Sequence, residues 1–151
     1  MFSMKRRIFA LGLALALLCS AAYAAGYIAP EYISAEDYGE PLRILQDYLG
    51  VTEIDPYSKE PWFGELTLTA LEQFQYEYGL EATYEFDAQT LYALLDLPAQ
   101  DEYSDPLVWI PMHGGARYHV DEFCSLMIEP QQMPETCAYA LEFTPCLRCC
   151  Y

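Results

Sequence analysis

The fold of the first half of the chain is decided by residues 62–80, W-F-G-E-L-T-L-T-A-L-E-Q-F-Q-Y-E-Y-G-L. Apolar residues recur there at the three- and four-residue spacing of one helix face, and charged residues such as Glu72 fall on the opposite side. Gly64 precedes the first turn, and Gly79 stands where a left-handed cap favours glycine. The pattern predicts a helix whose buried face consists of Thr67, Ala70, Leu71, Phe74 and Tyr78.

Two further helices are predicted on either side of this one. Pro41 suits the first turn of the earlier helix, because its missing N–H has no partner to lose there. Gly50 ends that helix after a stripe of leucines. Asp87 suits the N-cap of the later helix, which carries leucines on one side. We therefore predict a mainly α three-helix bundle over residues 39–97.

Several motifs follow one another in this region: Leu45-Gln46, Phe63-Gly64-x-x-Thr67-x-x-Ala70-Leu71-x-x-Phe74-Gln75, Gly79-Leu80 and Thr90. Their order resembles the peptidoglycan-binding-like domain, a three-helix module of bacterial wall enzymes. Family members are auxiliary binders without catalytic residues, so the resemblance implies wall binding rather than catalysis. Residues 83–91 also resemble a turn in the propeptides of metalloproteinases. Tyr84 departs from the family pattern, which usually has glycine there, and a bulky residue at positive φ costs about 1 kcal/mol.

Three aromatic residues are candidates for contact with wall sugars or stem peptides. Tyr57, Trp62 and Tyr76 lie in or beside the predicted turns and the outer helix face, and rigid aromatic faces suit stacking. The alternative is that they pack against the bundle, as most aromatic residues do. Trp62 would then close the core beside Phe63, and the tyrosines would cover helix flanks.

Residues 1–24 have the features of a signal peptide. Three basic residues precede an apolar run from Ile8 to Leu18, and small residues at Ala22 and Ala24 suit a signal peptidase. The run is short for a membrane span, which needs about twenty apolar residues. Cys19 raises lipidation as an alternative, although the residue before it is not small. Residues 25–38 show no sustained period and are predicted to be an extended leader.

The charge of the chain excludes several classes of partner. Without residues 1–24 it has 4 basic and 23 acidic residues, a formal net charge of −19. Nucleic acids and anionic membranes are bound chiefly through Lys and Arg, so neither is an expected partner of the processed chain. Peptidoglycan and teichoic acids are themselves anionic. A basic protein partner is therefore a second possibility beside a cell-wall component.

The last third of the chain is predicted to be a separate small α+β module. Residues 98–106 contain two prolines and several acids, which is typical of a linker. Residues 107–112 and 116–120 are extended runs on either side of a Gly-Gly pair, which predicts a β-hairpin. Residues 134–141 suit a short helix. The Cys/His-rich module thus covers residues 107–151.

Four residues of this module have the spacing of a structural zinc site. His119-x4-Cys124 and Cys146-x2-Cys149 supply an imidazole and three thiolates, which close a tetrahedral shell around zinc. A closed shell leaves no position for substrate, and such a zinc ion would contribute to folding. Cys150 is an alternative to Cys149 as the ligand. Five cysteines follow the signal segment, so two disulfides with one thiol left over are the other interpretation.

The same region resembles a module found at the end of many secreted bacterial proteins. The shared pattern contains Trp109-Ile110-Pro111, Tyr118-His119 and Thr144-Pro145-Cys146-Leu147-Arg148-Cys149. The Pro-Cys-x-x-Cys end also resembles the zinc-binding module of the Ada DNA-repair protein. Glu142 departs from the pattern by standing where a helix-ending glycine is usual, and Cys137 and Cys150 are additional thiols.

These features predict a non-catalytic protein. A wall-active zinc peptidase needs an open site with histidine and carboxylate ligands, and the chain has two histidines and no H-E-x-x-H motif. We interpret the sequence as a secreted or wall-associated, peptidoglycan-binding protein with a structural zinc module. The alternatives are an extracytoplasmic protein-interaction module that has lost wall binding, and an accessory part of a wall hydrolase.

Overall fold

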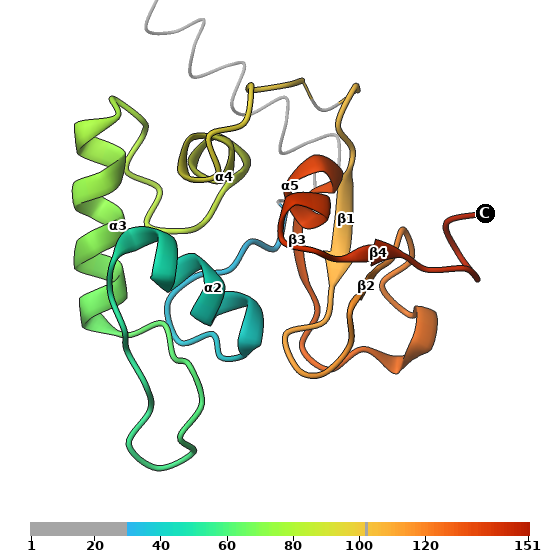
Figure 1. Ribbon diagram of the computed structural model, residues 1–151, viewed down its shortest axis with the longest axis horizontal. Coiled ribbons are helices and arrows are strands. Elements are labelled where there is room, and N and C mark those ends of the chain that lie inside the picture. The colour runs from blue at the N-terminus through green and yellow to red at the C-terminus, as the bar shows by residue number, and fades with distance from the viewer. Residues whose placement is uncertain (1–29, 102) are drawn as a thin grey trace, which may run out of the picture. The chain divides into compact units, whose positions relative to one another are not determined.

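The computed structural model describes residues 30–101 and 103–151, which form a helical N-terminal region and a smaller strand-containing C-terminal part (Figure 1). The predicted signal peptide and the first residues of the predicted leader lie outside the described residues. None of the described helices is long and apolar enough to cross a bilayer. The elements are α2 (Glu40–Leu49), α3 (Glu65–Glu77), α4 (Ala88–Leu94), β1 (Leu107–Ile110), β2 (Arg117–Tyr118), the 3₁₀ turn η1 (Cys124–Leu126), β3 (Gln131–Pro134), α5 (Glu135–Ala140) and β4 (Thr144–Pro145).

The ends of α2 follow from its sequence. Pro41 lies in the first turn, as predicted, and Gly50 adopts the left-handed conformation at the C-cap. Gly39, the N-cap, has a φ of 126° and approaches the C-terminal part so closely that a Cβ would overlap the carbonyl oxygen of Met112. Only glycine suits both the backbone conformation and this approach.

Helix α3 forms as predicted, but its buried face differs from the prediction. Thr67 and Leu71 are fully buried, whereas Tyr78 is 60% exposed and stacks on Phe74 with ring centroids 4.3 Å apart. Gln75 takes the inner position instead. The prediction for Tyr78 was wrong because this residue lies past the last helical turn, where the helical period no longer directs the side chain inward.

Two glutamine side chains lie inside the helical region and connect its loops. The Nε2 atom of Gln46 donates to the Trp62 carbonyl at 2.9 Å and to Thr67 Oγ1 at 2.8 Å. In the same way, Gln75 donates to Thr90 Oγ1 at 2.9 Å and to a backbone carbonyl of the loop before α4. Buried amides are tolerated when their donors are satisfied, so these two residues fix the positions of the loops around α3.

A carboxylate from the preceding loop caps the N-terminus of α3. Glu53 accepts hydrogen bonds from the backbone N–H groups of Gly64, Leu66 and Thr67 at 3.0, 3.1 and 2.8 Å. These groups have no partner within the helix, so a distant acceptor takes the place of a local cap. Burial raises the pKa of Glu53, but hydrogen bonds from Thr67, Leu66 and Gly64 outweigh it and hold the pKa below its usual value.

Helix α4 begins at the predicted cap. Asp87 accepts a hydrogen bond from the Thr90 N–H at 2.8 Å. In the turn before it, Tyr84 has a φ of 61°, the left-handed conformation that the family pattern meets with glycine. Tyr84 is therefore under backbone strain in the folded protein.

The predicted hairpin of the C-terminal part was largely wrong. β1 pairs along its length with β3, antiparallel, and β2 pairs with β4, parallel. The predicted partners meet only at Trp109 and His119, which exchange backbone hydrogen bonds of 2.7 and 2.8 Å. The loop between them carries Pro111 and turns away too early to extend the ladder. The short helix predicted over 134–141 forms as α5.

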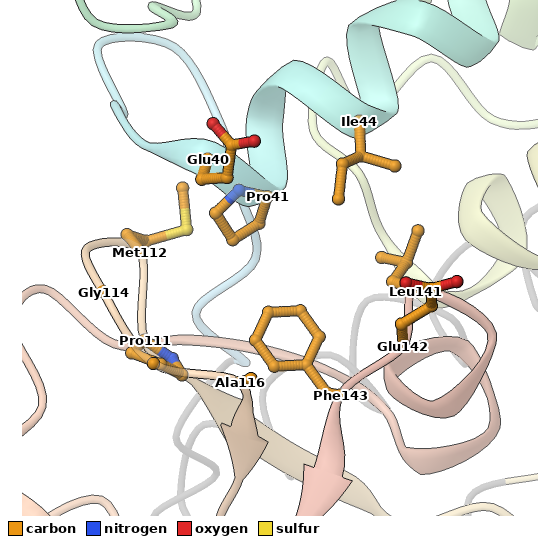
Figure 2. A pocket seen from close by; sticks show the side chains of 11 residues that line it. Glu40, Pro41, Ile44, Pro111, Met112, Gly114, Ala116, Leu141, Glu142 and Phe143 are labelled. Atoms are coloured by element: carbon orange, nitrogen blue, oxygen red, sulfur yellow. The ribbon is translucent and has the colours of Figure 1, made fainter.

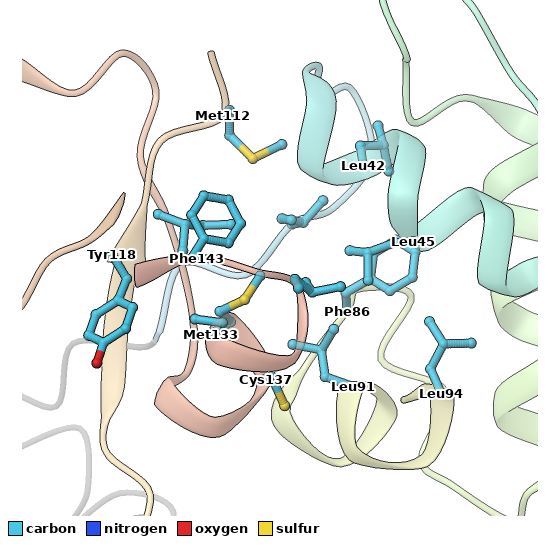
Figure 3. Packing of buried hydrophobic residues seen from close by; sticks show 14 of the residues in the cluster. Leu42, Leu45, Phe86, Leu91, Leu94, Met112, Tyr118, Met133, Cys137 and Phe143 are labelled. Atoms are coloured by element: carbon cyan, nitrogen blue, oxygen red, sulfur yellow. The ribbon is translucent and has the colours of Figure 1, made fainter. Parts of the chain in front are cut away.

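One hydrophobic core extends through both parts of the described chain. Leu42 and Leu45 from α2 belong to the same buried cluster as Met112 and Met133 from the C-terminal part, and Figure 3 shows these side chains gathered together. Residues 31–151 form one compact unit. The module boundaries at residues 97 and 107 stay a prediction, but the packing on either side of them is continuous.

Residues before α2 and between α4 and β1 also take part in this unit. Ile33 is 1% exposed, and its carbonyl accepts from the Phe86 N–H at 2.9 Å. Asp105, within the predicted linker, is 3% exposed. Its carboxylate accepts from the Tyr92 hydroxyl of α4 at 2.5 Å and from the Thr136 N–H of α5 at 2.9 Å. One buried carboxylate thus joins a helix of each part.

We expect Gly39→Ala to lower the free energy of unfolding by about 2 kcal/mol or more, because alanine meets both an unfavourable φ and the Met112 carbonyl. Urea unfolding followed by circular dichroism measures the effect. Gly114→Ala is the control, since its φ is 60° but nothing lies within 4 Å of the added Cβ. Equal losses in the two variants would contradict the close approach.

We expect Tyr84→Gly to raise the free energy of unfolding by about 1 kcal/mol, because glycine relieves the left-handed strain. Tyr84→Ala removes the same ring but keeps a Cβ, so it should give no stabilisation. Urea midpoints of the two variants provide the test. A stabilisation that alanine matches would assign the effect to the ring instead of to the backbone.

Candidate metal centre and exposed aromatic surface

The C-terminal strands bring four predicted metal-ligating side chains together. His119 directly follows β2, and its backbone is bonded to Trp109 of β1. Cys124 begins η1. Cys146 follows β4, and its N–H donates to the Tyr118 carbonyl at 3.0 Å. The strand pairing of β2 with β4 therefore places the local His/Cys pair beside the Cys-x-x-Cys turn.

The ligand atoms of this cluster are close enough to hold one metal ion. The donor atoms of His119, Cys124, Cys146 and Cys149 all lie within 4.8 Å of one another. The Sγ atoms of Cys124 and Cys146 are 3.9 Å apart, and Cys149 Sγ lies 3.5 Å from His119 Nδ1. Three of the four residues are buried. The predicted set is thus assembled as a single site.

The surroundings favour the metal-binding forms of two of these ligands. Hydrogen bonds from the backbone N–H groups of Arg148 and Cys149 lower the pKa of Cys146 to about 7. Burial, with Arg117 nearby, lowers the pKa of His119, so the neutral imidazole that binds metal is favoured. Ser125 lowers the pKa of Cys124, but burial and the adjacent thiols outweigh it and the pKa is raised. A metal ion would therefore have to displace the proton of Cys124.

The remaining cysteines are placed differently. Cys137 is fully buried in α5 among core residues, and burial raises the pKa of its thiol to about 12. Cys150 Sγ lies 3.8 Å from Cys149 Sγ, but Cys150 is not a member of the cluster. All five described cysteines are free thiols. The geometry selects Cys149 over Cys150 as the fourth member.

Tyr57 is displayed at the end of a structured loop. Asp55 accepts from the N–H groups of Tyr57 and Ser58 at 2.9 and 2.6 Å, and Ile54 bridges to Pro61 at the base. The loop between α2 and α3 protrudes from the helical region in Figure 1, and Tyr57 is 92% exposed. The ring is thus presented to solvent by a loop with internal hydrogen bonds.

Trp62 and Tyr76 do not form one surface with each other. Trp62 is half-buried in the segment just before α3 and stacks on Tyr38 with ring centroids 6.5 Å apart. Its Nε1 atom is buried and has no hydrogen-bond partner among the described residues. Tyr76 is 85% exposed in the last turn of α3. Helix α3 is about 20 Å long, at 1.5 Å per residue, and it separates Trp62, which precedes its first turn, from Tyr76 in its last turn.

The family comparison points to the helical region. Residues 38–94 match the model of a family described as a putative peptidoglycan binding domain. The match covers α2, α3 and α4 and stops before the C-terminal part. No curated protein and no solved structure matches the chain. The likeness of residues 107–151 to Ada-type knuckles stays a prediction.

Several residues that shape these sites were not identified as such from the sequence. Asp105 was assigned to a linker, and Glu53 was given no role. Both carboxylates accept hydrogen bonds from residues far along the chain; Thr136, which donates to Asp105, is 31 positions away. Gln46 and Gln75 were visible only as positions in the family motif. A polar residue directly after a core position, as in Leu45-Gln46, was the available signal.

Proposed function

We propose that this chain is a secreted, non-catalytic protein that binds peptidoglycan through its helical region and carries a structural zinc ion in its C-terminal part. The family match to residues 38–94 is the observation on which the wall-binding proposal rests. Helices α2, α3 and α4 would form the three-helix bundle of that family. Tyr57 and Tyr76, the two most exposed aromatic residues of the matched region, are the proposed contacts.

Trp62 is proposed to support the contact surface more than to form it. Its stacking on Tyr38 holds the ring at the base of the loop that presents Tyr57. Stacking on a rigid aromatic ring suits sugars and peptide stems, since little conformational freedom is lost on binding. Two separated tyrosines suit an extended polymer, because each can meet a different repeat of the same strand.

The proposed metal is zinc because the donor set, and two of the separations between donor atoms, suit a tetrahedral shell. Zinc binds sulfur at about 2.3 Å and nitrogen at about 2.1 Å, which separates two sulfurs by about 3.8 Å and a sulfur from a nitrogen by about 3.6 Å. The corresponding separations are 3.9 Å for Cys124 and Cys146 and 3.5 Å for Cys149 and His119. Three thiolates and one imidazole are also a donor set that zinc prefers.

The proposed zinc ion is structural. Four protein ligands fill the tetrahedral shell, so no position remains for a substrate or a reactive water. The C-terminal part has two two-stranded sheets and one short helix, and metal ligation would connect η1 to the turn after β4. This arrangement supports the non-catalytic assignment, as does the presence of only two histidines in the chain.

Secretion is proposed from residues 1–24, with localisation outside the cytoplasm or in the cell wall. Zinc ligation protects thiols in an oxidising compartment, because the thiolates are no longer free to attack a disulfide. Two disulfides are the competing outcome. The Sγ atoms of Cys124 and Cys146 lie 3.9 Å apart and would form one of these disulfides.

We expect one zinc ion per chain in protein that begins at residue 25 and is purified without chelator. Cys124→Ser should abolish zinc retention, because Cys124 is one of the four residues that contribute a donor atom. Cys137→Ser should leave zinc retention unchanged, because Cys137 is not one of them. Elemental analysis combined with thiol titration gives the answer. Two disulfides and no zinc in the unsubstituted protein would contradict the metal assignment.

We expect the same protein to sediment with purified peptidoglycan sacculi. Replacing Tyr57 and Tyr76 together by serine should weaken the affinity by about tenfold, because stacking contacts contribute roughly 0.5–1.5 kcal/mol each. Tyr139→Ser is the matched control, since this tyrosine is 68% exposed but lies outside the family match.

The salt dependence of binding distinguishes the cell wall from a basic protein as the partner. The chain and the wall are both anionic, so added salt should strengthen sedimentation by screening their repulsion. Equal sedimentation of the double variant and the control would contradict the proposed contacts. No sedimentation at any salt concentration would favour an interaction module that has lost wall binding.

A further inference from the structure

A preformed cavity lies between α2 and the C-terminal part, and Figure 2 shows the side chains that line it. Neither the metal-cluster residues nor Tyr57 and Tyr76 are among its lining residues. Its volume is about 310 Å³, at the lower end of the range for small-ligand pockets, roughly 300–1,000 Å³. Ile44 of α2 lies on one side and Phe143 on the other, and Pro41, Pro111 and Leu141 complete the apolar walls. The family match does not include the residues of the C-terminal side.

The walls of the cavity are held by the core of the molecule. Leu141 and Phe143 are 5% and 6% exposed and belong to the buried cluster. The lip contains Gly114 and Gly115, and a Cβ on Gly115 would lie 3.1 Å from Pro111 Cγ. Because these parts are fixed by packing elsewhere, a ligand would not have to organise the site, which lowers the cost of binding.

The charged residues that line the cavity are both glutamates. Glu40 already shares its Oε1 atom with the Arg43 guanidinium, at 2.8 Å from Nε. Glu142 is exposed, and among the described residues no hydrogen bond or ion pair reaches its carboxylate. Its φ of 69° is left-handed, so a carboxylate is carried at a position where glycine would be less strained. The rim therefore offers one unpartnered negative charge beside apolar walls.

We propose that this cavity is the docking site for a cationic segment of a protein partner. An aliphatic or aromatic side chain of the partner enters between Ile44 and Phe143, and a neighbouring Lys or Arg pairs with Glu142. Charge complementarity supports this occupant, because the rim is anionic and the processed chain carries a net charge of −19. The same charge disfavours a second copy of this chain. The proposal goes beyond wall binding and does not depend on it.

The probe is the heptapeptide Gly-Lys-Leu-Lys-Phe-Lys-Gly, acetylated and amidated, with unlabelled peptide added to ¹⁵N-labelled protein that begins at residue 25. We expect amide shifts at Ile44, Ala116 and Phe143. Two control peptides separate the contributions: Glu in place of Lys removes the charge match, and Ser in place of Leu and Phe removes the apolar part. Neither control peptide should produce these shifts.

Glu142→Gly is the decisive variant, because it removes the carboxylate while relieving the left-handed backbone. It should unfold at higher urea than the unsubstituted protein and yet bind the probe about threefold more weakly, as expected for one partly exposed ion pair. Tyr84→Gly controls for strain relief and Glu72→Gln for the loss of one exposed negative charge. Both should bind like the unsubstituted protein.

A second variant tests the apolar part. Ala116 is exposed at the cavity wall, so Ala116→Tyr should fill the space without disturbing the core, and it should abolish the shifts. Equal weakening by Glu72→Gln and Glu142→Gly would show diffuse attraction to an acidic surface and overturn the proposal. Shifts at the same residues with a soluble peptidoglycan stem peptide, and none with the probe, would overturn it in favour of a wall ligand.

Discussion

The burial of α2 against the C-terminal part is the packing interaction on which the rest of the structure depends. Leu42 and Leu45 share one core with Met112 and Met133, so the helical region and the Cys/His part stabilise each other. The glycine at position 39 lets the two backbones approach, and the Asp105 carboxylate bonds α4 to α5 across the same junction. The apolar side chains that meet at this junction are buried because each part covers the other.

This packing also determines where chemistry can occur. The metal cluster depends on the pairing of β2 with β4, which lies in the C-terminal part and away from the matched family region. The cavity lies where residues of α2, the loop after β1 and the segment after α5 come together. The exposed tyrosines belong to the outer side of the helical region. The proposed sites for metal ligation, wall contact and partner docking thus involve different residues of one compact unit.

Residues close together in the sequence predicted the ends of the helices well. They did not predict contacts between residues far apart in the chain. Gly50 and Asp87 cap helices by interactions within a few residues, so sequence alone was sufficient. The left-handed backbone at Tyr84 and Glu142 was also visible, as departures from glycine in the two resemblances. The grouping of the four His and Cys side chains could be predicted, because their spacing in the sequence is typical of residues that meet at one site. The pairing of β1 with β3 could not, because it joins residues more than twenty positions apart and the Gly-Gly turn offered a closer partner.

The central claim is that residues 31–151 unfold as one unit, and Cys137 allows a direct test because it is fully buried in the shared core. Urea unfolding would be followed by helical circular dichroism and, in parallel, by pulsed alkylation of Cys137 mapped by mass spectrometry. Coincident midpoints are the predicted result. Alkylation of Cys137 at urea concentrations where the helical signal is still intact would contradict the claim, because the C-terminal part would then open while the helices remain folded.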